Sequence, residues 1–199
     1  METYKQINLN DYVQTGEGGT SLTFARMARQ LHATKADTKR LPSVKDALRR
    51  FYQQKDLVSQ EYKERALNFL DKAPDADTCV HGDMHIGNVI TDGQRTLWID
   101  LGMFSYGRPE WDLAWLWSMS HYIDGQRSDF LLHITPETLK AHWDIFLPAY
   151  LGTTDSTAID DYTKRLMPFY AVRVPYMLDT LVNGRLPEEA FKPLSQLIR

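Results

Sequence analysis

The sequence predicts a mainly α-helical protein of the α+β class, in which helices surround one small β-hairpin sheet. Two observations lead to this class. Apolar residues recur at helical spacing through most of the chain. The β-prone runs are confined to residues 79–101, where Asp92-Gly93 marks a tight turn between two of them. At 199 residues the chain is long enough for one well-buried core or two small lobes.

Three helices are expected before residue 79. Residues 1–19 are polar and end in TGEGG, which does not match a phosphate-binding glycine pattern and favours a flexible connector. A first helix should begin at Thr20 or Ser21 and end near His32, with one apolar face. Ser43-x-x-Asp46 resembles a capping box and predicts the start of a second helix. A third should cover Leu57–Lys72 and end before Pro74.

The second half of the chain predicts further helices. Pro109 suits the first turn of a helix that is apolar nearly all round and therefore buried. Asp112 is its exception, and a carboxylate there must be paired or hydrogen-bonded. Thr135-Pro136 reads as the start of the next helix. A long helix should run from about 156 to 183. The tryptophans of the buried helix are predicted core residues: Trp111, Trp115 and Trp117.

Bulk properties exclude several classes of protein. A net charge of −3 and a pI near 6.1 do not favour a nucleic-acid binder, which normally shows a basic face. The single cysteine excludes an internal disulfide framework and is consistent with a reducing cytosol. No apolar run approaches the ~20 residues that span a bilayer, and the first residues lack the features of a signal peptide. We therefore expect a cytoplasmic protein that binds neither nucleic acid nor membrane.

One short stretch between the β-prone runs indicates chemistry. His81-x-Asp83-x-x-x-x-Asn88 has the spacing of the catalytic loop of phosphoryl transfer, where the Asp accepts the substrate hydroxyl proton and the Asn holds Mg²⁺. Asp100 follows in a D-x-G sequence, where the Asp holds the metal that bridges the β- and γ-phosphates. One amide oxygen and one carboxylate suit Mg²⁺, which prefers oxygen ligands and completes its shell with phosphates and water.

A zinc site is the competing interpretation of the same stretch. The sequence from His81 to His85 reads H-x-D-x-H, which occurs in metallohydrolases and would make the protein a metal-dependent phosphohydrolase. Zinc sites normally need three or four ligands, and the remaining histidines lack a matching motif. The phosphohydrolase stays the weaker alternative.

HGDMHIGN, followed by IDLG and GRPEWDLA, resembles the aminoglycoside phosphotransferase / choline kinase family of the protein-kinase-like superfamily. The flanking sequences resemble a poorly characterised bacterial branch, and the resemblance covers most of residues 20–185. It implies the helical C-terminal lobe of a protein-kinase-like fold, with the small hairpin sheet carrying the catalytic loop. It also implies ATP and Mg²⁺ as cofactors and a small hydroxylated acceptor as substrate. The implied site residues are Asp83 as catalytic base, Asn88 and Asp100 as metal ligands, and His81, His85 and Asp112 as supports of the loop.

The resemblance further implies an N-terminal β lobe with a Gly-rich loop and a strand lysine that hold the ATP phosphates. The stretch similar to the region between the lobes begins within the first twenty residues, and no such loop or strand is found. We therefore expect residues 1–19 to be a remnant of the interlobe region and 20–199 to be the C-terminal lobe, with the ATP-binding lobe absent. The expected function is a small-molecule phosphotransferase, incomplete or weak as this chain alone.

An absent lobe has two further implications. A non-catalytic half-kinase that only binds a ligand or partner is the main alternative function. Apolar surface normally covered by the β lobe would be open, and large open apolar patches usually pair with something. We therefore expect self-association or a partner that covers this surface. The residues that would bind the nucleotide base are not identified from the sequence.

Overall fold

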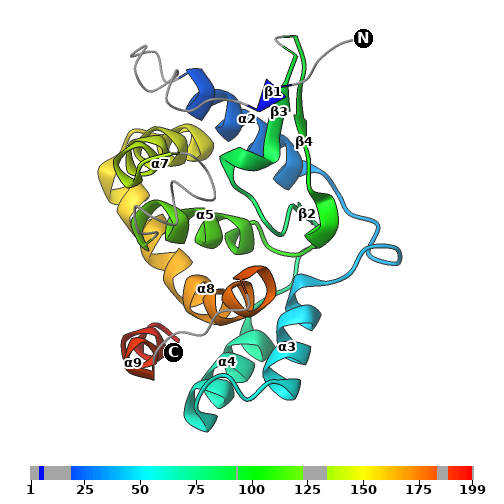
Figure 1. Ribbon diagram of the computed structural model, residues 1–199, viewed down its shortest axis with the longest axis vertical. Helices are drawn as coiled ribbons and strands as arrows, with labels where there is room; N and C mark the ends of the chain where they lie inside the picture. The colour runs from blue at the N-terminus through cyan, green and yellow to red at the C-terminus, as the bar shows by residue number, and fades with distance from the viewer. Residues whose placement is uncertain (1–4, 7–18, 93, 123–133, 183–187, 199) are drawn as a thin grey trace.

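The computed structural model describes residues 5–6, 19–92, 94–122, 134–182 and 188–198 of the chain. Helices form most of this structure and lie around two small β elements, which confirms the predicted mainly α class (Figure 1). The α-helices are α2 (Gly19–Ala33), α3 (Val44–Gln54), α4 (Gln60–Lys72), α5 (Glu110–Tyr122), α7 (Pro136–Leu151), α8 (Ser156–Val182) and α9 (Glu188–Leu197). Two 3₁₀ turns are η1 (Ile86–Asn88) and η2 (Leu101–Met103).

The strands form two antiparallel sheets, not the one that the sequence predicts. The predicted hairpin is present as β3 (Val89–Thr91) and β4 (Thr96–Trp98), and β1 (Lys5–Gln6) pairs with β3 on the other side. β2 (Cys79–Val80) instead pairs with β5 (Ser105–Tyr106). Strands of two residues are too short to show an alternating pattern, so their partners could not be predicted. Gly93 of the predicted turn lies outside the described residues.

Most helix starts follow the predicted caps. The Ser43 hydroxyl accepts a hydrogen bond from the Asp46 N–H at 3.2 Å and begins α3, and Thr135 caps α7 in the same way. The predicted start of α4 at Leu57 was wrong, because Ser59 is the cap and accepts from the Tyr62 N–H. α8 continues through both of its internal prolines.

The core brings α5 between α7 and α8, and α2 against α7 (Figure 1). The Phe24 ring of α2 lies 5.2 Å from the Trp98 ring and 5.4 Å from the Phe146 ring, so it joins the hairpin to α7. Trp111 is buried, as predicted, and its ring lies 4.7 Å from that of Phe169 on α8. The segment between β2 and β3 lies against the start of α5, where Asp112 binds its backbone. Within the part of the chain that the structure describes, no helix is long and apolar enough to cross a membrane.

Candidate active site

The loop between β2 and β3, residues 81–88, carries most of the predicted site residues. Gly82 has φ +89°, a left-handed conformation that favours glycine. A Cβ atom there would overlap the carbonyl oxygen of Met103, so the lack of a side chain lets the loop touch η2. The loop and the D-x-G turn, far apart in sequence, are therefore in direct contact.

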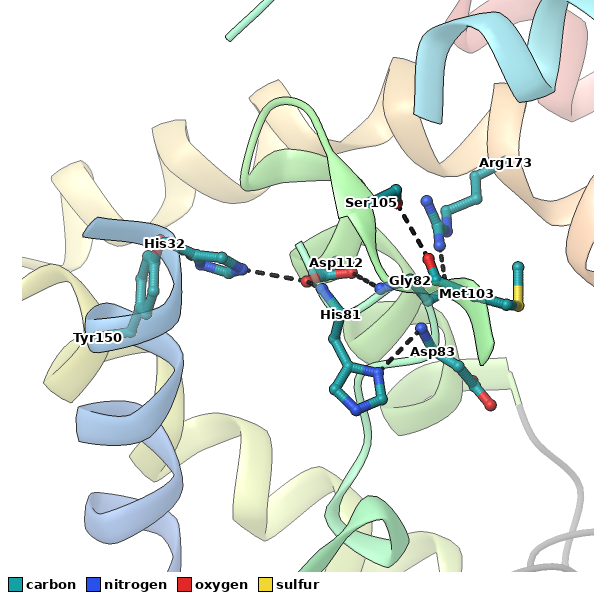
Figure 2. Close-up of polar contacts among 9 residues, drawn as sticks. All are labelled: His32, His81, Gly82, Asp83, Met103, Ser105, Asp112, Tyr150 and Arg173. Atoms are coloured by element: carbon teal, nitrogen blue, oxygen red, sulfur yellow. Dashed lines mark hydrogen bonds and ion pairs between the residues drawn. The ribbon is translucent and has the colours of Figure 1, made fainter. Parts of the chain in front are cut away.

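Asp112 of α5 binds the backbone at the start of this loop (Figure 2). Its Oδ2 accepts from the His81 N–H at 2.7 Å, and its Oδ1 accepts from the Gly82 N–H at 2.9 Å. The His32 Nε2 lies 3.2 Å from the Asp112 Oδ2. The side chain is fully buried, which alone would raise its pKa, but the hydrogen bond and electrostatic interaction with His32 and the charge of Arg173 lower the pKa below its usual value. Asp112 is therefore an ionised clamp on the loop.

The clamp reaches two further helices. His32 is at the end of α2, and its Nδ1 lies 2.9 Å from the Tyr150 hydroxyl on α7. The series of contacts from Tyr150 through His32 to Asp112 thus connects α2, α5 and α7 to the loop (Figure 2). Sequence reasoning missed His32 and Tyr150 as members of the site. Their only sequence signal is a polar residue at the end of an apolar face, which is too common to identify a role.

The Asp83 carboxylate lies beyond the clamp and is held by two side chains. Its Oδ1 accepts from the Trp115 indole N–H at 2.9 Å, and its Oδ2 lies 3.6 Å from the His85 Nε2. Partial burial acts to raise the pKa of Asp83, but His85 and the Trp115 N–H outweigh it, so the pKa lies below its ordinary value. Asp83 is therefore ionised at neutral pH and able to accept a proton.

Trp115 differs from its predicted role as a core residue. It is half-buried, it packs against the core with part of its surface, and it turns its indole N–H to Asp83. Trp111 and Trp117 are buried, as predicted. Because α5 is apolar nearly all round, helical spacing could not distinguish the face that meets the core from the face that meets the loop.

The two loop histidines use their ring nitrogens within the loop and its neighbour. The His81 Nδ1 accepts from the Asp83 N–H at 3.3 Å, so its Nε2, 3.0 Å from the Ile99 carbonyl oxygen, is the donor. Burial lowers the pKa of His81, partly opposed by Asp112, and the ring is neutral at pH 7. The His85 Nδ1 accepts from the Gly87 N–H at 3.1 Å, which leaves its Nε2 facing Asp83.

Asn88 and Asp100 carry the predicted metal donors, at the end of the loop and in the D-x-G turn. The Asn88 Nδ2 donates to the Asp83 carbonyl at 2.8 Å, so its Oδ1 is turned to the opposite side and has no hydrogen bond to any described residue. The Ile99 N–H donates to the Asn88 carbonyl at 3.0 Å, which brings the Asp100 turn beside Asn88. Asp100 is exposed, with φ 54° and ψ 60°, and its carboxylate likewise has no hydrogen bond to the residues described.

The donors on this side fit Mg²⁺. An amide oxygen and a carboxylate are hard oxygen ligands, and the hydrogen bond from the Asn88 Nδ2 leaves the amide oxygen free to coordinate. No group of three His, Cys, Asp or Glu residues is placed to hold a metal in the described ranges. A donor pair of this size suits a cation whose remaining ligands are water and nucleotide phosphates.

Two solved structures resemble the fold: a choline/ethanolamine kinase family protein from Mesorhizobium loti, with 15% identity and a TM-score of 0.52, and an ethanolamine kinase from Plasmodium vivax, with 14% identity and a TM-score of 0.50. The matches cover 100% and 90% of this chain but only 67% and 59% of those proteins, so the chain spans about two thirds or less of their length. At these identities the likeness shows the fold, that of a kinase-like C-terminal lobe, as predicted.

A search of curated proteins finds no match. The sequence model of the phosphotransferase enzyme family matches residues 8–144, which include the loop, the D-x-G turn and all of α5. The chain therefore belongs to the phosphotransferase enzyme family.

Proposed function

We propose that the protein transfers the γ-phosphoryl group of ATP to a hydroxyl group of a small molecule. The observation that carries the proposal is the arrangement around Asp83. An ionised carboxylate is held by Trp115 and His85, and two free oxygen donors, on Asn88 and Asp100, lie on the same loop and hairpin. Phosphoryl transfer needs positioning and charge stabilisation more than covalent chemistry by the protein, and such a site provides both.

Asp83 would act as the base. The acceptor hydroxyl donates its hydrogen bond to the Asp83 carboxylate, the hydroxyl oxygen bonds to the γ-phosphorus, the bond to the ADP oxygen breaks, and the hydroxyl proton passes to Asp83. Asn88 and Asp100 would hold Mg²⁺, which supplies charge neutralisation on the phosphate oxygens. The hydrogen bond from the Trp115 indole and the contact with His85 fix the Asp83 carboxylate for this step.

The acceptor class is proposed from the named relatives. Both similar structures are described as choline or ethanolamine kinases, so an amino alcohol is the first acceptor to test. Aminoglycosides are the next class, because the sequence resembles the aminoglycoside phosphotransferase / choline kinase family, and sugars stand for other hydroxyl compounds. The phosphohydrolase alternative is disfavoured by His81, whose two ring nitrogens already bind the Asp83 N–H and the Ile99 carbonyl.

We further propose that residues 20–199 act as the C-terminal lobe of a kinase and have weak phosphotransferase activity when alone. In kinases of this superfamily a separate β lobe clamps the ATP phosphates. The sheets of the described residues are one of three strands and one of two, and neither has the size of such a lobe. Loss of one charge-stabilising donor slows a reaction by roughly 10²–10³-fold, so these residues without such a clamp should transfer phosphate at least that much more slowly.

The test is transfer of labelled γ-phosphate from Mg·ATP to a panel of amino alcohols, aminoglycosides and sugars. We expect slow transfer to at least one class, and about 10²–10⁴-fold less with Asp83→Asn, because the base is removed while the shape is kept. Asp160→Asn, an exposed acid on α8, is the matched control and should leave the rate unchanged. A folded protein that transfers phosphate to no acceptor, or an Asp83→Asn variant with the wild-type rate, would refute the proposal.

A further inference from the structure

A small cavity lies behind the loop, between α3, α8 and the D-x-G turn. Its volume is about 200 Å³, and its polar lining comes from Ser43, Ser105, Arg173 and Tyr176, together with the backbone at Gly82 and Met103. Among the described residues, Arg173 is the one charged residue in the lining, and no carboxylate lines the cavity. The Asp83 carboxylate points away from Arg173 in Figure 2, so this cavity is separate from the proposed phosphoryl-transfer site.

The Arg173 guanidinium is a buried charged group with fewer hydrogen bonds than its donors allow. Only 2% of the residue is exposed, and its Nη2 donates to the Gly82 carbonyl. Its Nε and Nη1 have no hydrogen-bond partner among the described residues. A buried donor without a partner is costly, and the guanidinium carries five N–H donors in all. An oxygen acceptor in the cavity would remove this cost.

The two carboxylates that interact electrostatically with Arg173, those of Asp112 and Asp83, do not serve as that acceptor. The Asp112 oxygens accept hydrogen bonds from the His81 and Gly82 backbone and lie against His32. The Asp83 oxygens face Trp115 and His85. Neither residue has a hydrogen bond to the free guanidinium nitrogens, which leaves room for an anion supplied from outside.

Other donors surround the same cavity. The first turn of α3 lines it, and the N-terminus of a helix carries partial positive charge that favours anions. The Ser43 oxygen accepts from the Asp46 N–H, so its own hydroxyl hydrogen is available to donate. The Tyr176 hydroxyl also has no hydrogen bond to the described part of the chain. A buried cation, two hydroxyls and a helix N-terminus therefore meet around one cavity.

We propose that this cavity binds a small oxyanion of the size of phosphate or acetate, with Arg173 as its charged partner. A volume of about 200 Å³ holds roughly six water molecules, which is enough for such an ion and too small for a nucleotide. Because Arg173 also holds the Gly82 carbonyl, directly before Asp83, the bound ion would adjust the position of the proposed base. The site does not depend on Mg·ATP binding, so it can be tested apart from the proposed function.

The test is an NMR titration of the whole chain with sodium phosphate and, separately, sodium acetate, without Mg²⁺ and at constant ionic strength in chloride. We expect saturable shifts of the Arg173 side-chain signals with at least one of the two probes, and the stronger probe distinguishes a tetrahedral from a planar ligand. Tyr176→Phe should weaken binding by about tenfold, because one donor to a charged ligand is lost.

Two variants keep the proposal falsifiable if Arg173 proves necessary for folding. Ala47→Leu fills the cavity without touching the guanidinium charge and should abolish saturable binding. Ala158→Leu, on the exposed surface of α8, is its control and should bind as the wild type does. Absence of saturable shifts with either probe in the folded wild type, or equal binding by Ala47→Leu, would overturn the proposal and leave water as the content of the cavity.

Discussion

Two sets of polar atoms at the loop of residues 81–88, here called its inner and outer sides, differ in how completely they are hydrogen-bonded within the protein. The inner side consists of Asp112, His32, Tyr150 and the backbone N–H groups that Asp112 binds. These groups contact one another within the protein. The outer side consists of the Asn88 amide oxygen and the Asp100 carboxylate, which have no hydrogen bond to the described residues. The inner side therefore fixes the loop in advance, and the outer side leaves its donors for a ligand.

The largest expected effect is on the inner side. Asp112→Ala removes the acceptor for two backbone N–H groups and for His32, all of them buried. Removing one partner from a buried charged cluster lowers the free energy of unfolding by about 3–5 kcal/mol. Asp71→Ala, which breaks only an exposed ion pair with Arg49, should lower it by less than about 1 kcal/mol. Urea denaturation of both variants measures the difference, and equal values would contradict the role of Asp112 as a clamp.

The second effect is acid sensitivity where α2 meets α7. His142 is fully buried, its Nδ1 lies 2.8 Å from the Ser21 hydroxyl oxygen, and burial lowers its pKa to about 4. An unfolded histidine titrates near ~6.5, so between these values only the unfolded chain binds the proton. The free energy of unfolding should keep the whole His142 contribution above pH 6.5 and fall by roughly 3 kcal/mol as the pH drops to 4.

His142→Leu tests this acid sensitivity, because it removes the titrating group. Its unfolding free energy should change less between pH 6.5 and 4 than that of the wild type. The lowered pKa values of Asp83 and Asp112 act in the same direction, but their contribution is lost at lower pH, near and below the ordinary aspartate value of ~3.9. Identical pH profiles for the wild type and His142→Leu would show that His142 is not the group responsible.

A smaller effect is expected at Trp115, which binds the Asp83 carboxylate. Trp115→Phe removes the N–H that binds the Asp83 carboxylate. The free energy of unfolding should fall by about 1.5–3 kcal/mol, the contribution of a hydrogen bond to a charged group. The pKa of Asp83 should rise, and any transfer activity that needs the ionised base should be lost at a higher pH than in the wild type. NMR titration of the Asp83 carboxyl carbon measures this pKa. Trp117→Phe, from the same helix but without this contact, should leave it unchanged, and a shift of equal size would contradict the assignment.

The smallest effect on stability is expected on the outer side. Asp100 is in the left-handed region, which costs an L-residue about 1–2 kcal/mol and is free for glycine. Asp100→Gly should therefore raise the free energy of unfolding by about 1 kcal/mol or less, because glycine also gains freedom in the unfolded chain. Strain of this kind is retained at functional sites. A loss of stability would show that the carboxylate has a structural role.

The inner and outer sides were also unequally predictable. Asn88 and Asp100 stand in one short motif with the spacing of a known reaction, so the sequence was sufficient to propose the outer side. Asp112 binds His32 of α2 as well as the loop backbone, and His32 in turn contacts Tyr150 of α7. Nothing in the spacing of His32 or Tyr150 connects them to the loop. The need for a partner at Asp112 was predictable from burial, whereas the identity of the partner depends on tertiary packing.

The same distinction holds for the fold. α2, which has one apolar face, and α7, which has a clear cap at Thr135, begin within a residue or two of their predicted positions. The start of α4 was missed because Leu57 and Val58 extend the apolar pattern before the cap at Ser59. The pairing of β2 with β5 joins residues on either side of the hairpin, and two-residue strands carry no pattern that could reveal it.

Calorimetric titration of the whole chain with ATP, in the presence and absence of Mg²⁺, tests the central claim most directly. If the outer side is a cation and phosphate site, the wild type should bind ATP only with Mg²⁺, and Asp100→Ala should abolish that binding while remaining folded. Asp160→Asn should bind as the wild type does. ATP binding that is independent of Mg²⁺, binding that survives Asp100→Ala, or no binding by a folded wild-type chain would contradict the account.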